Sequence, residues 1–350
     1  MGIKYKKINL RKKMKKTKLL IICITSLLTL SCSKNNKVEQ TYFESMNTFM
    51  KVQAYGENAK EANEAAQKYI GQLERIISAT KEESDIYKLN HSETYPVKVN
   101  EQALSLIKLA LNMSEISDGA FNPCLYPVSS LWGFTKKQYR IPSEEEIAEK
   151  LALCDWKKVQ ITDDVVIMEP GMQFDLGGIG KGFAGDEAAK KMKEFGIKSA
   201  LLDLGGNIQI IGTKPDGSDW TIGIRNPFEE GAIGILKASN VAVITSAGYE
   251  RYFVGEDGKK YIHIFDGTTG CPAESDLVST TAIAPSGTYC DGLSTALYVL
   301  GLERSIELWR KQKNFDFILI TKNKEVYITK RLAPKFTIDS TLGFTSFIIK

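Results

Sequence analysis

The stretch DLGGIGKGFAGDEAAKK, residues 175–191, decides how this chain is interpreted. Gly180, Gly182 and Gly185 stand at G-x-G-x-x-G spacing, and LLDLGG follows with Asp203. The same string marks dinucleotide-binding domains, in which glycines open a loop and a helix N-terminus faces a pyrophosphate. Three interpretations compete: a dinucleotide fingerprint, a phosphate-handling or flavin-handling loop of another kind, and a glycine-rich turn.

The sequence around the loop argues against a dinucleotide fingerprint. That fingerprint belongs to alternating strands and helices, whereas mainly strand-like segments follow here. Asp175 stands at the mouth of the loop, where a carboxylate repels a pyrophosphate unless a cation lies between them. A P-loop is excluded because Gly182, instead of Ser or Thr, follows Lys181. In the remaining interpretation the loop has no binding or catalytic function and is a strand-to-helix turn with a solvated Lys181.

The composition is that of a globular protein without nucleic-acid chemistry. The 350 residues are 43% hydrophobic and 25% charged, and the length permits one large domain or two closely packed ones. Nine of the 46 basic residues lie within residues 1–31, which contain no acid. The other 37 basic and 42 acidic residues give the body a net charge of −5. Such a body lacks the basic surplus that nucleic acid binding requires.

Residues 1–31 are organised as an export signal. A basic segment precedes the apolar run LLIICITSLLTL, which is too short for a comfortable membrane span. Ser31 then precedes Cys32, although Thr29 stands where leucine is usual. The pattern resembles a bacterial lipoprotein signal, in which Cys32 becomes the lipidated first residue; a simple secretory signal is the alternative. We expect a signal at 1–31, a tether at 32–42 and one functional domain at 43–350.

The remaining cysteines do not indicate a metal ribbon. No two of them have C-x-x-C spacing. Disulfides are permitted outside the cytoplasm, but a core of this size does not need them. We expect most to be buried small hydrophobic residues; they are Cys124, Cys154, Cys271 and Cys290.

Residue periodicity predicts an α+β fold, because runs of strands are interrupted by few helices. Helices are expected at residues 59–79, 101–117, 142–154 and 183–195, with a pair of helices within 291–312. Strands are expected at 48–56, 165–168, 199–204, 208–211, 220–225, 241–245, 261–265 and 280–284, and a hairpin around residues 323–324.

Two further segments carry candidate chemistry. Asp291 and Thr295 stand at i and i+4 near the start of a predicted helix, so both oxygens project from one face. A carboxylate and a hydroxyl without nearby His or Cys suit Mg²⁺; the alternative is that Asp291 only caps the helix. His263 precedes the turn at Asp266-Gly267 and is a candidate base or a hydrogen-bonded structural histidine.

Taken together, these motifs resemble the ApbE family of FAD:protein FMN transferases. DLGGIGKGFAGD resembles the family's D-x-GG-I-x-KG-x-x-x-D signature. The other motifs that match in order are SDIYKLN, GAFNPCLYPVSSLWGF, LLDLGGNI, SAGYERYF, YIHIFDGTTGCPA and CDGLSTAL. The resemblance spans nearly the whole chain after residue 42.

The resemblance implies an α+β, ApbE-like (T-fold-like) architecture of mixed, largely antiparallel sheets with packed helices and an FAD cleft between lobes. It implies that Mg²⁺ is held by the Gly178 carbonyl, Asp291 and Thr295. The flavin and phosphate site would be lined by Met46, Phe121, Asn122, Asp175, Lys181, Tyr249 and Ile264.

The implied reaction transfers FMN from FAD to a Ser or Thr hydroxyl of an acceptor flavoprotein and releases AMP. Lys181 would support the charge on the phosphate, and His263 is our candidate for removing the hydroxyl proton. The acceptor would be a membrane electron-transfer subunit or a secreted flavoprotein, and the enzyme an exported, membrane-anchored lipoprotein facing the periplasm. The alternatives are a Mg²⁺-dependent FAD pyrophosphatase that yields FMN and AMP, and a flavin-binding lipoprotein without turnover.

Three residues depart from the family pattern. Asn122 replaces the usual aspartate after phenylalanine, and Asp203 stands where asparagine is usual. Gly267 replaces a proline in the HI-x-DP motif. These departures put contacts of Asn122 and Asp203 in doubt but remove no predicted metal ligand.

Overall fold

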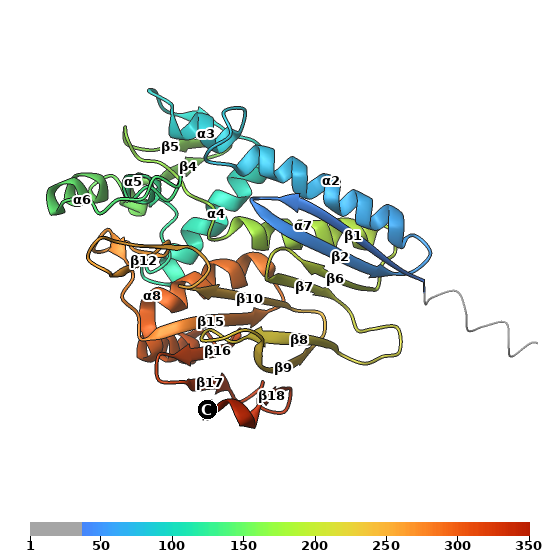
Figure 1. Ribbon diagram of the computed structural model, residues 1–350. Coiled ribbons are helices and arrows are strands. Elements are labelled where there is room, and N and C mark those ends of the chain that lie inside the picture. Colours follow the sequence, from blue (N-terminus) through green and yellow to red (C-terminus); the bar gives the residue numbers. More distant parts are fainter. Residues whose placement is uncertain (1–36) are drawn as a thin grey trace, which may run out of the picture.

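The structure is a computed structural model that describes residues 37–350 (Figure 1). The predicted signal and Cys32 lie outside the described residues and stay predictions. Within residues 37–350, no helix has both the length and the apolar character to cross a bilayer.

A nine-stranded sheet runs through the molecule in the order β1-β2-β6-β7-β10-β15-β16-β17-β19. Its neighbouring strands are antiparallel except for β17 and β19, which are parallel. The strands are β1 (Val38–Ser45), β2 (Thr48–Tyr55), β6 (Ser199–Asp203), β7 (Asn207–Ile211), β10 (Ala242–Ala247), β15 (Leu277–Ala284), β16 (Asp316–Thr321), β17 (Glu325–Thr329) and β19 (Thr345–Ile349).

Three long helices cover one face of this sheet: α2 (Ala59–Ile77), α7 (Gly180–Glu194) and α8 (Gly287–Gln312), with α4 (Glu101–Ile116) packed against α2 and α8. In α2 the buried residues recur every three or four positions, which gives the helix one apolar stripe; they include Ala62, Ala66, Ile70, Leu73 and Ile77. This stripe and the inward side chains of the strands form the largest core cluster.

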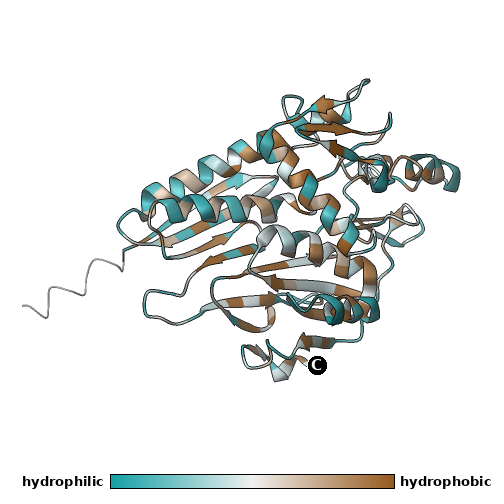
Figure 2. Cartoon of the chain, turned by 180° about the vertical axis from the view of Figure 1, so that it is seen from behind, coloured by the Kyte–Doolittle hydropathy of each residue, from teal (hydrophilic) through white to brown (hydrophobic). Residues whose placement is uncertain are grey.

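A small sheet with the order β18-β9-β8 packs on the other face of the main sheet. It consists of β8 (Trp220–Arg225), β9 (Ala232–Ala238) and β18 (Phe336–Ile338). Because side chains alternate along a strand, Val243 faces this second core while its neighbours Ala242 and Ile244 face the helices. The main sheet is therefore buried on both faces over its central strands. In Figure 2, brown residues recur along these strands and teal residues along the outer sides of the helices.

Shorter elements complete the chain. A sheet β3-β5-β4 is formed by β3 (Val97–Lys98), β4 (Gln160–Thr162) and β5 (Val165–Ile167). Two hairpins pair β11 (Tyr252–Val254) with β12 (Lys260–Ile262) and β13 (Phe265–Asp266) with β14 (Cys271–Pro272). The short helices are α3 (Asp85–Asn90), α5 (Tyr126–Leu131), α6 (Glu144–Leu151), η1 (Trp156–Lys158) and η2 (Ser340–Leu342).

An aromatic cluster joins the segment after α5 to the two hairpins. Phe134 contacts Phe253 and Phe265 at ring-centroid distances of 5.7 Å and 5.6 Å, and Trp132 contacts Tyr261 at 5.3 Å. Such ring contacts add to the area that the side chains bury. Figure 1 shows α5, α6 and β12 together at one end of the molecule, where this cluster holds them.

The expected α+β fold is confirmed. The predicted capping box at Ser143 starts α6, and the predicted pair of helices is α8, which kinks at Gly301 where φ is 73°. Several boundaries are wrong. The helices expected at 183–195 and within 291–312 begin earlier, at Gly180 and Gly287. Residues 38–42 of the predicted tether belong to β1, and the predicted strand 261–265 is divided between β12 and β13.

The four body cysteines are free, and Cys124, Cys154 and Cys290 are buried, as expected. Burial raises the pKa of Cys154 to about 12, so this thiol stays neutral at physiological pH.

Candidate active site

The glycine-rich stretch forms a tight loop that leads directly into α7. The backbone N–H of Asp175 donates to the Pro123 carbonyl at 2.7 Å, and Asp175 Oδ1 accepts the N–H of Gly177 at 2.8 Å. Gly180 N–H donates to the Leu176 carbonyl, so the helix begins three residues before the predicted start. No strand immediately precedes this loop, and β6 after it is antiparallel to both of its neighbours. The βαβ context of a dinucleotide fingerprint is therefore missing.

Gly178 lies where three segments of the chain meet. A Cβ added to Gly178 would come within 3.2 Å of the Phe121 ring and 3.7 Å of Thr295 Oγ1. Thr295 is half-buried, and its hydroxyl lies 3.2 Å from Ser246 Oγ, which in turn lies 2.8 Å from Ser294 Oγ. Two predicted metal ligands, Gly178 and Thr295, are thus neighbours, and a predicted flavin contact, Phe121, is beside them.

Asp291 lies one helical turn before Thr295 and is only 4% exposed. Its Oδ2 accepts the backbone N–H of Gly182 at 2.8 Å, which connects the carboxylate to the glycine-rich segment. Within residues 37–350 no Lys or Arg forms an ion pair with it. The alternative that Asp291 caps the helix is wrong, because Ser286 is the N-cap of α8. The tertiary structure therefore brings a buried carboxylate next to the loop and leaves its charge without a cationic side-chain partner.

Lys181 lies at the start of α7, and its charge acts on the ring of His263. Lys181 is the second residue of α7, and its ammonium makes no hydrogen bond or ion pair within the described part of the chain. The ring of His263 is partly open to solvent, yet desolvation is the main reason that its pKa falls to about 4; the charges of Arg251 and Lys181 lower the pKa further.

One hydrogen bond determines the tautomer of His263. Nδ1 lies 3.1 Å from the Arg251 carbonyl oxygen, which also accepts the backbone N–H of His263. Because a carbonyl oxygen only accepts, Nδ1 carries the proton and Nε2 is left as an acceptor. Arg251 Nη2 donates to the Phe134 carbonyl at 3.1 Å, which connects the residue before β11 to the aromatic cluster.

The remaining predicted flavin contacts have structural partners of their own. Asn122 Nδ2 donates to the Cys154 carbonyl at 2.8 Å, and Asn122 Oδ1 accepts from Cys124 N–H. An aspartate at this position could not make the first bond. Ile264 is buried beside Ile262 and Tyr298, and its carbonyl accepts from Ala273 N–H.

Met46 and Tyr249 lie at two other places. Met46 has a φ of 50° in the turn between β1 and β2 and packs against the main core. Arg225 lies over the Tyr249 ring at 4.9 Å, and desolvation is the main reason that the pKa of Tyr249 is raised. No contact described above joins Met46 or Tyr249 to Gly178, so their role in flavin binding stays a prediction.

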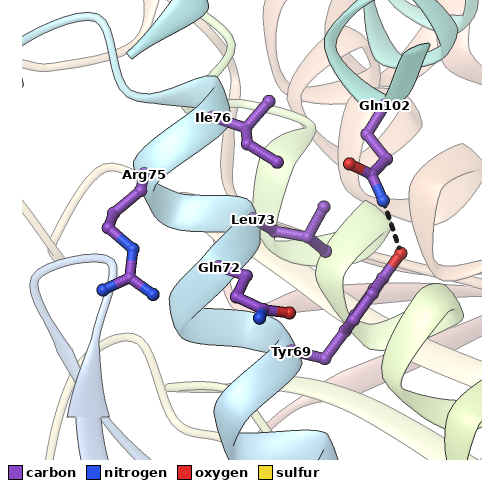
Figure 3. A pocket seen from close by; sticks show the side chains of 6 residues that line it. All are labelled: Tyr69, Gln72, Leu73, Arg75, Ile76 and Gln102. Atoms are coloured by element: carbon purple, nitrogen blue, oxygen red, sulfur yellow. Dashed lines mark hydrogen bonds between the residues drawn. The ribbon is translucent and has the colours of Figure 1, made fainter. Parts of the chain in front are cut away.

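A cavity of about 330 Å³ lies elsewhere, between α2 and the start of α4 (Figure 3). Gln102 Nε2 donates to Tyr69 Oη across it at 2.9 Å. The lining residues are Tyr69, Gln72, Leu73, Arg75, Ile76 and Gln102, and none of them is a predicted site residue.

Sequence reasoning missed several residues that hold the site together. Ser246 reaches Thr295, the Gly182 N–H reaches Asp291, and Arg251 holds His263. Asp186 in α7 accepts hydrogen bonds from the start of α8. All four lie inside the quoted motifs, so the motifs already pointed to the segments that contain them. No spacing rule predicted the contacts that these residues make.

Comparison with known proteins gives one consistent result. Residues 46–319 match the ApbE family. An FAD:protein FMN transferase of Treponema pallidum is 36% identical over 73% of this chain and 75% of its own length. One of Klebsiella pneumoniae is 32% identical over 77% of this chain and 84% of its own.

Solved structures agree. The ApbE protein of Thermotoga maritima superimposes with a TM-score of 0.78 at 32% identity and covers 87% of this chain and 98% of its own. The flavinyl transferase ApbE of Pseudomonas stutzeri, in its apo form, gives a TM-score of 0.75 at 29% identity over 83% of this chain and 93% of its own.

Proposed function

The chain belongs to the ApbE family, and on this premise we propose that it is a Mg²⁺-dependent FAD:protein FMN transferase. It moves FMN from FAD to a Ser or Thr hydroxyl of an acceptor flavoprotein and releases AMP. The names of the relatives support the flavin transfer; the metal, the hydroxyl acceptor and the AMP product are proposals that rest on the resemblance of the motifs to the family.

One observation supports the metal in particular: the buried, unpaired carboxylate of Asp291 beside Thr295 and Gly178. A buried carboxylate is costly unless a cation or hydrogen bonds compensate it, and among the described residues only the Gly182 N–H does so. Within residues 37–350 no three His, Cys, Asp or Glu side chains form a metal cluster. The available donors are a carboxylate, a hydroxyl and a backbone carbonyl, and such hard oxygens fit Mg²⁺. When bound, Mg²⁺ would neutralise charge on the pyrophosphate oxygens.

Lys181 and the start of α7 provide the second source of positive potential. The first N–H groups of a helix attract anions, and Lys181, the second residue of α7, adds a cation at this end of the helix. Lys181 would bind a phosphate oxygen in the ground state and stabilise the added charge as the acceptor oxygen attacks phosphorus and AMP leaves.

His263 is our candidate for accepting the proton of the acceptor hydroxyl. At pH 7 the ring is neutral, because its pKa lies near 4, and its Nε2 is the free acceptor atom. A neutral imidazole is the form that a general base requires.

The decisive experiment incubates the full-length chain with FAD, Mg²⁺ and candidate acceptor proteins. Covalent FMN on the acceptor together with free AMP is the expected result. Free FMN instead of protein-bound FMN would support the pyrophosphatase alternative, and unchanged FAD would support binding without turnover.

The same assay tests the metal. EDTA is expected to abolish transfer, and Asp291→Asn is expected to raise the Mg²⁺ requirement, with Asp216→Asn in an exposed turn as the matched control. Transfer that persists without divalent metal would refute the metal assignment.

We further propose that the enzyme is an exported bacterial lipoprotein, lipidated at Cys32 and facing the periplasm, where membrane-bound or secreted acceptors are accessible. This proposal rests on residues 1–32 of the sequence.

A further inference from the structure

One side chain outside the flavin and metal assignments accepts four hydrogen bonds from another helix. Asp186 lies in α7, and its Oδ1 accepts the backbone N–H of Gly287 at 2.7 Å. Its Oδ2 accepts from Ser286 Oγ at 2.7 Å, and from Thr288 through both the backbone N–H at 2.9 Å and Oγ1 at 2.8 Å. The carboxylate is thereby bound to three consecutive residues at the start of α8.

These donors belong to the first turn of α8, whose N–H groups have no partner inside the helix. Ser286, the N-cap, accepts the N–H of Tyr289 at 3.2 Å and so satisfies one of them. Asp186 satisfies the N–H groups of Gly287 and Thr288 from the neighbouring helix. Its negative charge also matches the positive end of the α8 dipole.

A second contact fixes the same pair of helices about one turn away. A Cβ added to Gly182 would lie 2.2 Å from the Gly287 carbonyl oxygen and 2.6 Å from Asp291 Cβ, so the two backbones touch there. The Gly182 N–H donates to Asp291 Oδ2 at 2.8 Å. The hydrogen bonds of Asp186 and the Gly182 contact together fix how α8 is rotated and positioned relative to α7.

We propose that Asp186 is a positioning residue for the metal and phosphate site. It acts through α8: by fixing the first turn of that helix, it sets Asp291 and Thr295 opposite Gly178 and Lys181, which α7 and its loop carry. This inference rests on the proposed function, because it concerns the Mg²⁺ site of that function.

Asp186→Asn in the full-length chain tests the proposal. Asparagine has the same size but offers one acceptor oxygen and a donor NH₂ to a group of donors, so it cannot satisfy all four. The matched control is Asp339→Asn, since Asp339 likewise accepts from a backbone N–H and a hydroxyl, those of Thr341, but lies beside η2.

Two readouts are measured for each variant. The first is the Mg²⁺ concentration that gives half of the maximal transfer rate; the second is the rise in unfolding temperature that Mg²⁺ with FAD produces. Asp186→Asn is expected to raise the half-saturating Mg²⁺ concentration roughly tenfold or more, as loss of supporting groups around metal ligands does. Saturating Mg²⁺ should restore most of the maximal rate, and the temperature rise at a fixed low Mg²⁺ concentration should be smaller than in the wild type.

The proposal is overturned if Asp186→Asn and Asp339→Asn have the same Mg²⁺ half-saturation while the wild type transfers FMN in a Mg²⁺-dependent manner. A wild type that neither transfers FMN nor gains stability from Mg²⁺ with FAD would instead refute the proposed function. If Asp186→Asn does not fold, Thr288→Val removes a single hydroxyl donor and should raise the half-saturation by a smaller factor. An unchanged value in that variant also contradicts the proposal.

Discussion

His263 and Asp291 show how single backbone contacts leave particular atoms free. The Arg251 carbonyl holds the Nδ1 proton of His263, which leaves Nε2 as an acceptor. Gly182 N–H occupies Oδ2 of Asp291, and Oδ1 has no hydrogen bond within residues 37–350. In both residues, the free atom is the one that the proposed chemistry needs. Neither contact is visible from residue type.

His263 predicts a specific dependence of stability on pH. Its pKa is about 4 in the folded protein and about 6.5 as an unperturbed side chain, so between these values the unfolded chain binds more protons. The free energy of unfolding should therefore fall as pH drops from about 6.5 toward 4. His263→Gln should weaken this dependence and also slow transfer at pH 7 by roughly 100-fold, a typical contribution of general-base catalysis.

Urea unfolding at pH 7 and pH 4.5 measures the first effect. His91→Gln is the matched control, since His91 is the other histidine of the chain and stacks on Tyr87 of α3. If His263→Gln and His91→Gln have the same pH dependence of stability, a lowered pKa of His263 is refuted. Full transfer activity in His263→Gln while FAD still binds refutes its catalytic role.

At the scale of elements, the close approach of α7 and α8 builds the site. α7 supplies Lys181 and the Gly182 N–H, and α8 supplies Asp291 and Thr295. Periodicity located both helices but placed their starts three to four residues late, because glycines and small polar residues carry no apolar signal. The strand around His263 was predicted as continuous because its alternation persists, whereas the chain leaves β12 at Ile262 and pairs anew in β13.

The helix contact predicts that Gly182→Ala is destabilising. The new methyl group would meet the Gly287 carbonyl and Asp291 Cβ, so the helices must separate. We expect a loss of roughly 1–3 kcal/mol in the free energy of unfolding, typical of overpacking, together with weaker Mg²⁺ dependence of FAD binding.

Gly71→Ala in α2 is the matched control for urea unfolding. A Cβ at Gly71 has no atom within 4 Å, so this variant should be neutral or up to about 1 kcal/mol more stable through helix propensity. Equal effects of Gly182→Ala and Gly71→Ala would show that the helices are not in backbone contact.

At the scale of the whole molecule, the nine-stranded sheet is a base for two layers. Helices α7 and α8 lie on one face with α2, and the small β18-β9-β8 sheet covers the other face. The aromatic cluster around Phe134 fixes the β11-β12 hairpin, from which the chain continues to His263. The chain enters the sheet at Val38, so residues 33–37 are all that separates β1 from Cys32.

This short separation predicts how the anchor acts. A lipid on Cys32 would keep β1 within about 20 Å of the membrane surface, the reach of six extended residues. Cys32→Ala should move the chain from the membrane fraction to the soluble fraction and leave transfer to a soluble acceptor unchanged. Fractionation with palmitate labelling checks this outcome, and labelling that persists in Cys32→Ala would refute lipidation at this cysteine.

The sequence by itself determined the fold class, most helices and strands, and the identity of the motif residues, because periodicity and short motifs are local properties of the chain. It placed Lys181 in the glycine-rich loop just before a helix, and Asp291 and Thr295 on one helix face. Only the tertiary structure decided that Gly182 N–H meets Asp291, 109 residues later, and that Asp186 meets Ser286, 100 residues later. Such contacts depend on how two helices pack on a shared sheet, and no local propensity encodes that packing. The sequence also offered Asp291 two roles, and the structure excluded that of a cap because α8 begins at Gly287 with Ser286 as its N-cap.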